Sequence, residues 1–242
     1  MRVFVAAVCA VVCLASPELA AACGVSSPGA PAGVCDASDA LDAKAAAARS
    51  YRVGLSGSYT TTAMWLSDGA RLDMQRQAVV ATLSLRLSRS TNLEFGAGAI
   101  AGGSLGSLAL RPGGLASASA SWRVVEQRGA GTPFVLLTAA ASFMAASTGD
   151  GAAIGAADVR AGGAIGTTLG RAQHATLTPY FAGQLFGGPT FWAHDGRAVT
   201  GTDIHKFAVG GGLAGSVGRF GLYAGGALLG ERSLSIGVSA GF

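Results

Sequence analysis

One pair of residues in this sequence has the types and spacing for acid–base chemistry: Asp203 and His205, separated by Ile204. A carboxylate and an imidazole within hydrogen-bond reach can pass a proton to or from a substrate. The surrounding residues alternate as in a strand, where side chains point to opposite faces in turn. This period places His205 on the same outward face as Phe207 and Val209, away from any groove. We therefore expect no catalysis from this pair.

A second group of ionisable residues has the spacing of an ion cluster. Centring a short turn on Ser90 places Arg86 opposite Glu94, and Arg52 and Arg123 fall on the same face of neighbouring strands. Buried charges need partners, so these residues are expected to lie together inside the fold. Such a cluster is either a plug that fixes strand register or a charge-selective constriction in a narrow pore.

Three further charged residues, Asp158, Arg160 and Lys206, are candidates for a second cluster near the outer end of the fold. We expect no cofactor and no metal. The glycines at 210–212 resemble a phosphate-binding loop only in composition, because no Lys-Ser or Lys-Thr pair follows them. Glycine within a strand more often marks tight curvature or a close approach between backbones.

Residues 1–22 have the pattern of a secretory signal peptide. Arg2 supplies the positive charge, residues 3–14 the apolar stretch, and the alanines at 20–22 a small-residue cleavage site. An exported protein is the expectation. Residues 23–49 then form an N-terminal segment, in which the alanine-rich part from Asp36 onward favours a short periplasmic helix.

Cysteine usage agrees with export. Cys9 and Cys13 lie within the signal, which leaves Cys23 and Cys35 on either side of a segment rich in Pro, Gly and Ser. In an exported protein such a pair predicts a disulfide. The alternative is that Cys23 carries a lipid, because residues 20–23 resemble the bacterial lipobox, although Ala20 stands where leucine is usual.

Composition limits the class of protein. Half of the 242 residues are hydrophobic and only 12% are charged, whereas soluble domains have about a quarter charged residues. Beyond residue 22 no apolar run is long enough for a membrane-spanning helix. The formal net charge of +4 is spread along the chain, which argues against nucleic-acid binding. Two classes remain: a soluble β protein with a large core, or a membrane barrel.

The positioning elements are predicted from a period of two that recurs along the chain. In the last ten residues, Leu234, Ile236 and Phe242 alternate with small residues that include Ser235 and Ser239. Ten strands are predicted, separated by short turns and by longer connections; the one at 134–146 is almost wholly apolar, so the pattern does not predict which of its side chains face outward. The strands lie near 51–59, 79–88, 93–99, 116–124, 134–146, 159–169, 177–185, 207–217, 220–228 and 233–242, and the longer connections span 61–74, 103–114, 147–156 and 188–202.

These features together resemble a small Gram-negative outer-membrane β-barrel over residues 50–242, with Phe242 as the terminal aromatic residue. The resemblance implies an all-β, antiparallel up-and-down barrel of about ten strands, eight being possible, located in the cell outer membrane. It implies contact with outer-membrane lipid and with the barrel-insertion machinery. Pairing of the terminal strand with the strand from Tyr51 would close the sheet. The loop at 188–203 is the expected surface for a partner.

Two alternatives come from other functional classes. Ten-stranded omptin-type proteases use an Asp/His pair, which Asp203 and His205 resemble, facing a second carboxylate pair. Here Asp68 and Asp73 are five residues apart, and no Asp-x-Asp pair stands on that loop. The other alternative is a soluble periplasmic barrel that binds an apolar ligand. We favour a non-catalytic barrel with a structural, narrow-pore or surface-interaction role.

Overall fold

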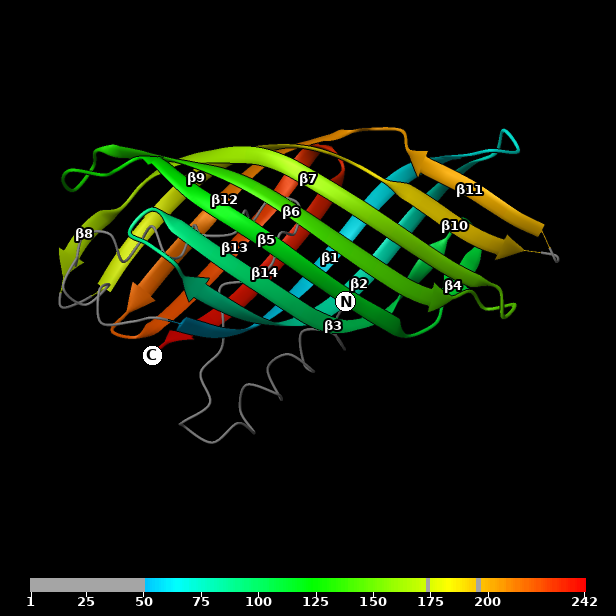
Figure 1. Ribbon diagram of the computed structural model, residues 1–242, viewed down its shortest axis with the longest axis horizontal. Helices are drawn as coiled ribbons and strands as arrows, with labels where there is room; N and C mark the ends of the chain where they lie inside the picture. The colour runs from blue at the N-terminus through cyan, green and yellow to red at the C-terminus, as the bar shows by residue number, and fades with distance from the viewer. Residues whose placement is uncertain (1–50, 173–174, 195–196) are drawn as a thin grey trace.

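The computed structural model describes residues 51–172, 175–194 and 197–242 (Figure 1). The predicted signal peptide, N-terminal helix and Cys23–Cys35 disulfide lie outside these residues. Strands make up most of the described chain: β1 (Tyr51–Leu66), β2 (Arg71–Arg86), β3 (Thr91–Leu105), β4 (Leu108–Leu110), β5 (Gly113–Val125), β6 (Pro133–Ser147), β7 (Ala153–Thr167), β8 (Leu169–Ala172), β9 (Ala175–Gly187), β10 (Pro189–His194), β11 (Arg197–Asp203), β12 (Phe207–Val217), β13 (Phe220–Gly230) and β14 (Arg232–Gly241).

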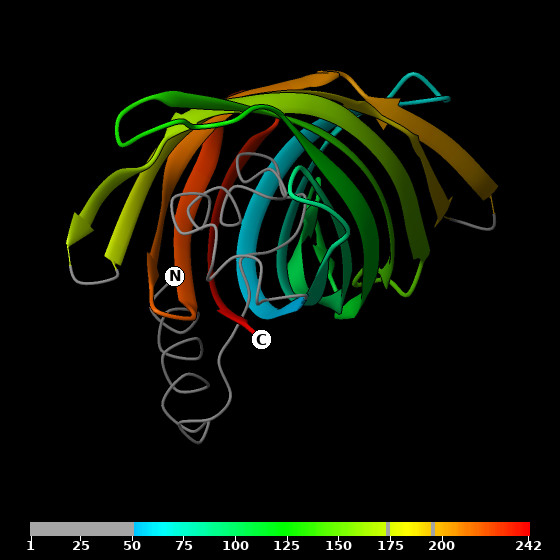
Figure 2. The same ribbon diagram turned by 60° about the vertical axis from the view of Figure 1, so that its left-hand side comes forward.

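Ten of these strands close into an antiparallel barrel, which Figure 2 shows as a continuous curved wall. The order around the barrel is β1-β2-β3-β5-β6-β7-β9-β12-β13-β14, and β14 pairs again with β1. The prediction of an all-β antiparallel barrel of about ten strands is confirmed. We call this part, which carries Tyr51 and Phe242 at its end, the ten-strand section. Among the described residues, no helix is long and apolar enough to cross a membrane.

The other end of the barrel is a smaller ring of eight strands, the eight-strand section. There β10 pairs with β7 and β11, and β11 pairs with β1. The change arises because β13 and β14 are short, so that their turn at Glu231 ends within the wall. Strand β1 pairs with β14 as far as Thr61, opposite Arg232, and with β11 from Met64, opposite Asp203.

The segments predicted as long connections are largely strand, so that part of the prediction is wrong. Strands β1 and β2 continue through 61–74 and leave residues 67–70 as the turn, while β10 and β11 occupy most of 188–202. The physical reason is a change of polarity along each strand. Apart from Arg52, inward positions of β1 near Tyr51 are small or hydroxylated, but Met64 and Leu66 are buried farther along the same strand.

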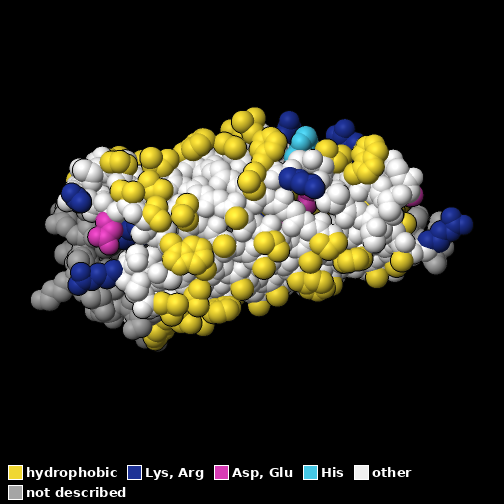
Figure 3. All heavy atoms as spheres, turned by 45° about the horizontal axis from the view of Figure 1, so that its top comes forward, with side chains coloured by type: hydrophobic (Ala, Val, Ile, Leu, Met, Phe, Trp, Pro, Cys, Tyr) yellow, Lys and Arg dark blue, Asp and Glu magenta, His cyan; other side chains and the backbone are white. Residues whose placement is uncertain are grey.

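In the ten-strand section the large apolar side chains point outward. Each of its strands contributes at least one exposed large hydrophobic side chain, for example Leu83 on β2, Phe181 on β9 and Leu222 on β13. Figure 3 shows these apolar side chains spread over the outer surface, with charged groups at both ends and a further group partway along. The inner face carries many serines and threonines, together with one apolar cluster that includes Phe134, Leu136, Ala164, Tyr180, Ala182, Ala214 and Tyr223.

The terminal strand has the predicted orientation and partner. Ile236 and Phe242 are 53% and 40% exposed, whereas Ser235 and Ser239 are each 1% exposed. Strand β14 pairs with β1 over ten residue pairs, and the Phe242 ring stacks on Tyr51 with 5.5 Å between centroids. The seam between the first and last strands is therefore closed by backbone pairing along its length.

Candidate functional site

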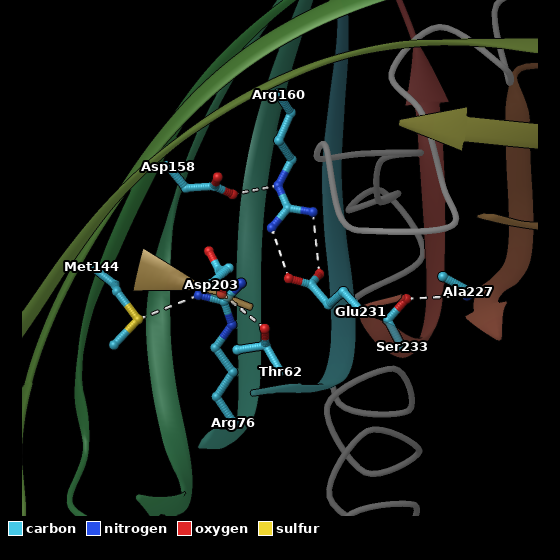
Figure 4. Close-up of polar contacts among 9 residues, drawn as sticks. All are labelled: Thr62, Arg76, Met144, Asp158, Arg160, Asp203, Ala227, Glu231 and Ser233. Atoms are coloured by element: carbon cyan, nitrogen blue, oxygen red, sulfur yellow. Dashed lines mark hydrogen bonds and ion pairs between the residues drawn. The ribbon is translucent and has the colours of Figure 1, made fainter. Parts of the chain in front are cut away.

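The most elaborate group of buried charges lies where the ten-strand section meets the eight-strand section. We call Asp158, Arg160 and Glu231 the junction cluster (Figure 4). Asp158 and Arg160 are two residues apart on β7, so both point into the barrel. Glu231 comes from the turn between β13 and β14. Because those strands are short, this turn lies at the same level along the barrel axis as Asp158 and Arg160. Residues more than 70 positions apart in sequence therefore meet in the lumen.

The guanidinium of Arg160 is enclosed on several sides. Its Nη1 and Nη2 donate to Oε1 and Oε2 of Glu231, both at 3.1 Å, which is the bidentate geometry of a strong charge-assisted pair. Its Nε lies 2.5 Å from Oδ2 of Asp158. The Phe186 ring lies 4.5 Å from the guanidinium carbon. The side chains of Arg160 and Glu231 are only 6% and 2% exposed, so water has little access to the pair.

The turn that carries Glu231 is also fixed by its backbone. The Glu231 amide donates to the carbonyl of Phe207 at 3.1 Å, which ties the hairpin tip to the start of β12. A glycine precedes it, and Gly230 has a φ of 77°, a conformation that other residues rarely adopt. The hairpin tip is therefore held by a backbone bond on one side and by Arg160 across the lumen.

Further polar contacts lie beside the cluster, where β11 joins β1. The Thr62 hydroxyl donates to Oδ1 of Asp203 at 2.8 Å, so Asp203 is turned toward β1 and the interior. Arg76 on β2 donates to the sulfur of Met144 on β6 at 3.3 Å. Figure 4 shows these side chains grouped near the junction cluster. They form a polar layer between the apolar clusters of the two sections.

In this arrangement Arg160 and the two carboxylates of the junction cluster bind one another, as in a structural ion cluster. A charge taken out of water loses several kcal/mol of solvation, which a buried pair recovers only with good geometry. Arg160 has that geometry with Glu231, and Asp158 adds an ion pair to its Nε. Its pairing with Asp158 confirms that part of the predicted second cluster, but the partner across the lumen is Glu231, and Lys206 is exposed. Sequence reasoning missed Glu231 because it lies in a tight turn rather than in an alternating segment.

The predicted cluster near Tyr51 differs in register from the expectation. Glu94 pairs with Ser84 and Arg86 pairs with Asn92, so the expected direct opposition of Arg86 and Glu94 is wrong by two residues. The Ser88 hydroxyl accepts from the amides of residues 90 and 91, which shifts the turn centre away from Ser90. Arg86 and Glu94 remain diagonal neighbours on one face.

Two hydrogen bonds locate members of that cluster. Ser84 donates to Oε2 of Glu94 at 2.8 Å, and Arg52 donates through Nη1 to Ser239 at 2.8 Å. Both Arg52 and Glu94 are buried, and Arg123 is half-buried on β5. That Arg52, Arg86, Glu94 and Arg123 act as one cluster stays a prediction.

The geometry does not assemble a catalytic pair at Asp203 and His205. Asp203 faces Thr62, whereas His205 is exposed and its ring packs edge-on against Phe207. Asp68 accepts from the amide of its own turn at Ala70. Asp73 is exposed on the outer face of β2, away from the lumen. The outward direction predicted for His205 is confirmed.

Other catalytic patterns also find no support. The hydrolase pattern Gly-x-Ser-x-Gly occurs around Ser104 and Ser239, but these lie within β3 and β14, whereas a nucleophile elbow is a turn between a strand and a helix. Within the described residues, no group of three or more His, Cys, Asp and Glu side chains is placed to hold a metal ion.

Comparison with known proteins gives likeness in fold alone. No family model and no curated protein matches the sequence. Among solved structures, the outer membrane protease OmpT from Escherichia coli is similar with a TM-score of 0.42 and 10% identity, covering 80% of this chain and 95% of that chain. The translocator domain of the autotransporter NalP from Neisseria meningitidis has a TM-score of 0.40 and 12% identity, covering 80% and 89%.

A third similar structure is the toluene transporter TodX from P. putida, with a TM-score of 0.33 and 11% identity, covering 88% of this chain and 71% of that chain. These neighbours are Gram-negative outer-membrane barrels, the class that the sequence resembles. They include a protease and a transporter, and likeness at this level carries no functional argument. The function must be argued from the chain itself.

Proposed function

We propose that this chain is an integral outer-membrane β-barrel with a closed lumen and no catalytic activity. The observation that carries the proposal is the apolar outer face of the ten-strand section, to which all ten strands contribute. A soluble barrel turns its large apolar side chains inward. Lipid around the barrel removes the cost of exposing them, and barrel closure satisfies the backbone.

The height of the ten-strand section fits this environment. Strand β14 has ten residues, which is about the length that crosses a bilayer when tilted. Arg232 begins that strand, and Arg219 lies in the turn at its other end; both are exposed. Charged groups thus lie at both edges of the apolar band, where they reach water. The eight-strand section then projects outside the cell.

The side chains that fill the lumen support the proposal that it is closed. The junction cluster lies at the point where the ring narrows from ten strands to eight. Apolar side chains fill the interior beyond it, among them Met64, Leu105 and Met144. This arrangement favours a structural or surface role over transport. Barrel-insertion machinery as the partner of Phe242, and a surface partner at 188–203, belong to this proposal; the latter region is the β10–β11 hairpin.

Membrane placement is tested with the full chain expressed in a Gram-negative host. We expect recovery in the outer-membrane fraction and a faster-migrating band on unheated SDS gels than on boiled ones. Recovery in the soluble periplasm would overturn the proposal.

Closure is tested by conductance in planar bilayers. The wild-type barrel should give no steady channels, because apolar side chains fill the interior beyond the junction. The triple variant Asp158→Ala/Arg160→Ala/Glu231→Ala, which leaves no charge of the junction cluster unpaired, should also give none, since that apolar core remains. Steady wild-type channels would show a pore and contradict the closed lumen. The variant Glu94→Gln, outside the junction cluster, is the control and should leave the barrel silent.

A further inference from the structure

The outer surface at the junction carries three kinds of side chain, which follow one another along the barrel axis. Below the junction lie exposed apolar side chains, at the junction lie exposed basic ones, and above it lie exposed aromatic and hydroxyl groups. Strands β12, β13 and β14 supply the first, the segment between β11 and β12 and the start of β14 the second, and β1, β10 and β11 the third. We call this surface the junction strip.

The lower part of the junction strip is apolar. Leu229 on β13 and Leu234 on β14 are 61% and 66% exposed, and Phe207 at the start of β12 is 43% exposed. These residues are neighbours, because β13 pairs with both β12 and β14. They belong to the apolar band that we assign to lipid, at its outer edge. Acyl chains of the outer leaflet would end here.

The middle part is basic. Arg232 and Lys206 are both exposed, and His205 beside them packs against Phe207. They are close because the amide of Glu231 donates to the Phe207 carbonyl, which brings the start of β14 beside residues 205–207. Figure 3 shows Lys and Arg side chains and a histidine gathered partway along the barrel, with apolar side chains on either side.

The acidic residues of the same elements do not cancel this positive charge from outside. Glu231 points into the lumen toward Arg160, and Asp203 points toward Thr62. The exposed Asp73 lies on β2, on the far side of β1 from the basic group, because β1 separates β2 from β11 and β14. Basic side chains outnumber acidic ones on this part of the outer surface, although Figure 3 also shows an acidic group beside them.

The upper part is a pair of aromatic side chains on the outer face of the eight-strand section. Trp65 and Phe191 are 54% and 53% exposed. Strand β11 lies between them, with exposed Thr200 opposite Phe191 and exposed Thr202 opposite Trp65. Exposed aromatic faces flanked by hydroxyl groups, outside the lipid band, suit the apolar faces and hydroxyls of sugar rings.

We propose that the junction strip binds one phosphorylated glycolipid of the outer leaflet, a step that rests on the membrane placement argued under Proposed function. Its acyl chains would lie on Phe207, Leu229 and Leu234, its phosphates on Arg232 and Lys206, and its sugars on Trp65 and Phe191. A membrane phospholipid offers the first two chemistries but not the third. The vertical order of the three parts matches the order of groups in such a glycolipid.

The test uses full-length chain refolded in detergent without bacterial lipid and then titrated with lipopolysaccharide. The wild type is expected to bind, and the double variant Arg232→Gln/Lys206→Gln should bind about thirtyfold more weakly, because each basic group near an anionic lipid headgroup contributes a similar small share. The control Arg89→Gln/Arg219→Gln removes the same charge from the opposite end, where both residues are exposed. This control should bind as the wild type does.

Two further probes separate the parts of the ligand. Trp65→Ala should weaken binding of lipopolysaccharide but leave binding of a bisphosphorylated lipid A without core sugars unchanged. Dephosphorylated lipopolysaccharide should bind the wild type as weakly as the intact glycolipid binds the Arg232→Gln/Lys206→Gln variant. Equal weakening by both double variants, or equal binding of phosphatidylglycerol vesicles and lipopolysaccharide, would overturn the proposal.

Gel mobility before and after heating is recorded for every sample. A wild-type barrel that folds into vesicles but binds no glycolipid contradicts this inference alone. A chain that does not fold into vesicles contradicts the membrane placement as well. The two failures are thus distinguishable.

Discussion

The two sections of the barrel share strands but have opposite polarity. On β1 of the ten-strand section, Tyr59 is exposed and Ser56 is buried. On the same strand in the eight-strand section, Met64 and Leu66 are buried. Strand β2 repeats the change, with Leu83 exposed in one section and Met74 buried in the other. One continuous wall therefore has apolar side chains outside over part of its length and inside over the rest.

The apolar side chains change from the outer to the inner face although the strands are continuous. This change indicates that the environment around the barrel differs along its axis. Where lipid surrounds the wall, the outside is apolar; where water surrounds it, the wall needs an apolar core as any soluble barrel does. The core of the eight-strand section comprises Met64, Leu66, Met74, Ile100, Leu105, Leu110, Met144, Ile154 and Trp192. The junction cluster lies where the two patterns meet.

The largest loss of stability is expected when the junction cluster loses Arg160. Arg160→Ala leaves Glu231, which is 2% exposed, without its bidentate partner, so the free energy of unfolding should fall by about 3–5 kcal/mol. The measurement is urea unfolding from phospholipid vesicles, followed by gel mobility. The triple variant Asp158→Asn/Arg160→Met/Glu231→Leu, which leaves no carboxylate of the cluster without its partner, should recover most of the loss. A loss below about 1 kcal/mol would show that the pair is not buried as described, since exposed pairs contribute no more than that.

The change of polarity also explains how far the fold could be predicted. The period of two predicts most strands of the ten-strand section, because lipid-facing residues such as Ile236 alternate with small ones such as Ser235. The strand at 134–146 is predicted instead from a nearly continuous apolar run. The same period of two predicts that β1 ends near Thr61 and that β2 begins after Met74. Between these residues the alternation continues, but the apolar side chains lie on the inner face instead of the outer one. A search for period two regardless of which face is apolar would have extended both strands.

The candidate site was predictable only in part. Asp158 and Arg160 are two residues apart on one strand, so their shared face follows from the sequence. Glu231 reaches them only because β13 and β14 end within the wall, and that height depends on the register of β14 against β1. No local sequence pattern predicts this register. The one available signal was an acidic residue in a tight turn between two apolar strands.

The next largest loss of stability is expected from a substitution that distinguishes the interiors of the two sections. Leu105 on β3 is 2% exposed in the core of the eight-strand section, so Leu105→Ala should lower the free energy of unfolding by about 2–5 kcal/mol. The matched control is Leu222→Ala on β13, where the leucine is 60% exposed on the outer face of the ten-strand section and leaves no cavity. Urea unfolding in vesicles measures both. Equal losses would contradict an apolar core confined to one section.

The last test compares the two outer faces directly. Leu213 on β12 is 51% exposed within the apolar band, so Leu213→Arg places a charge in lipid and should reduce stability in vesicles by about 2–4 kcal/mol. Ala193 on β10 is exposed on the eight-strand section, where Ala193→Arg should change stability by less than about 0.5 kcal/mol because water surrounds it. In detergent the difference should shrink, since micelles adapt to the charge. If both variants lose the same stability in vesicles, the lipid boundary does not lie at the junction, and the whole wall shares one environment.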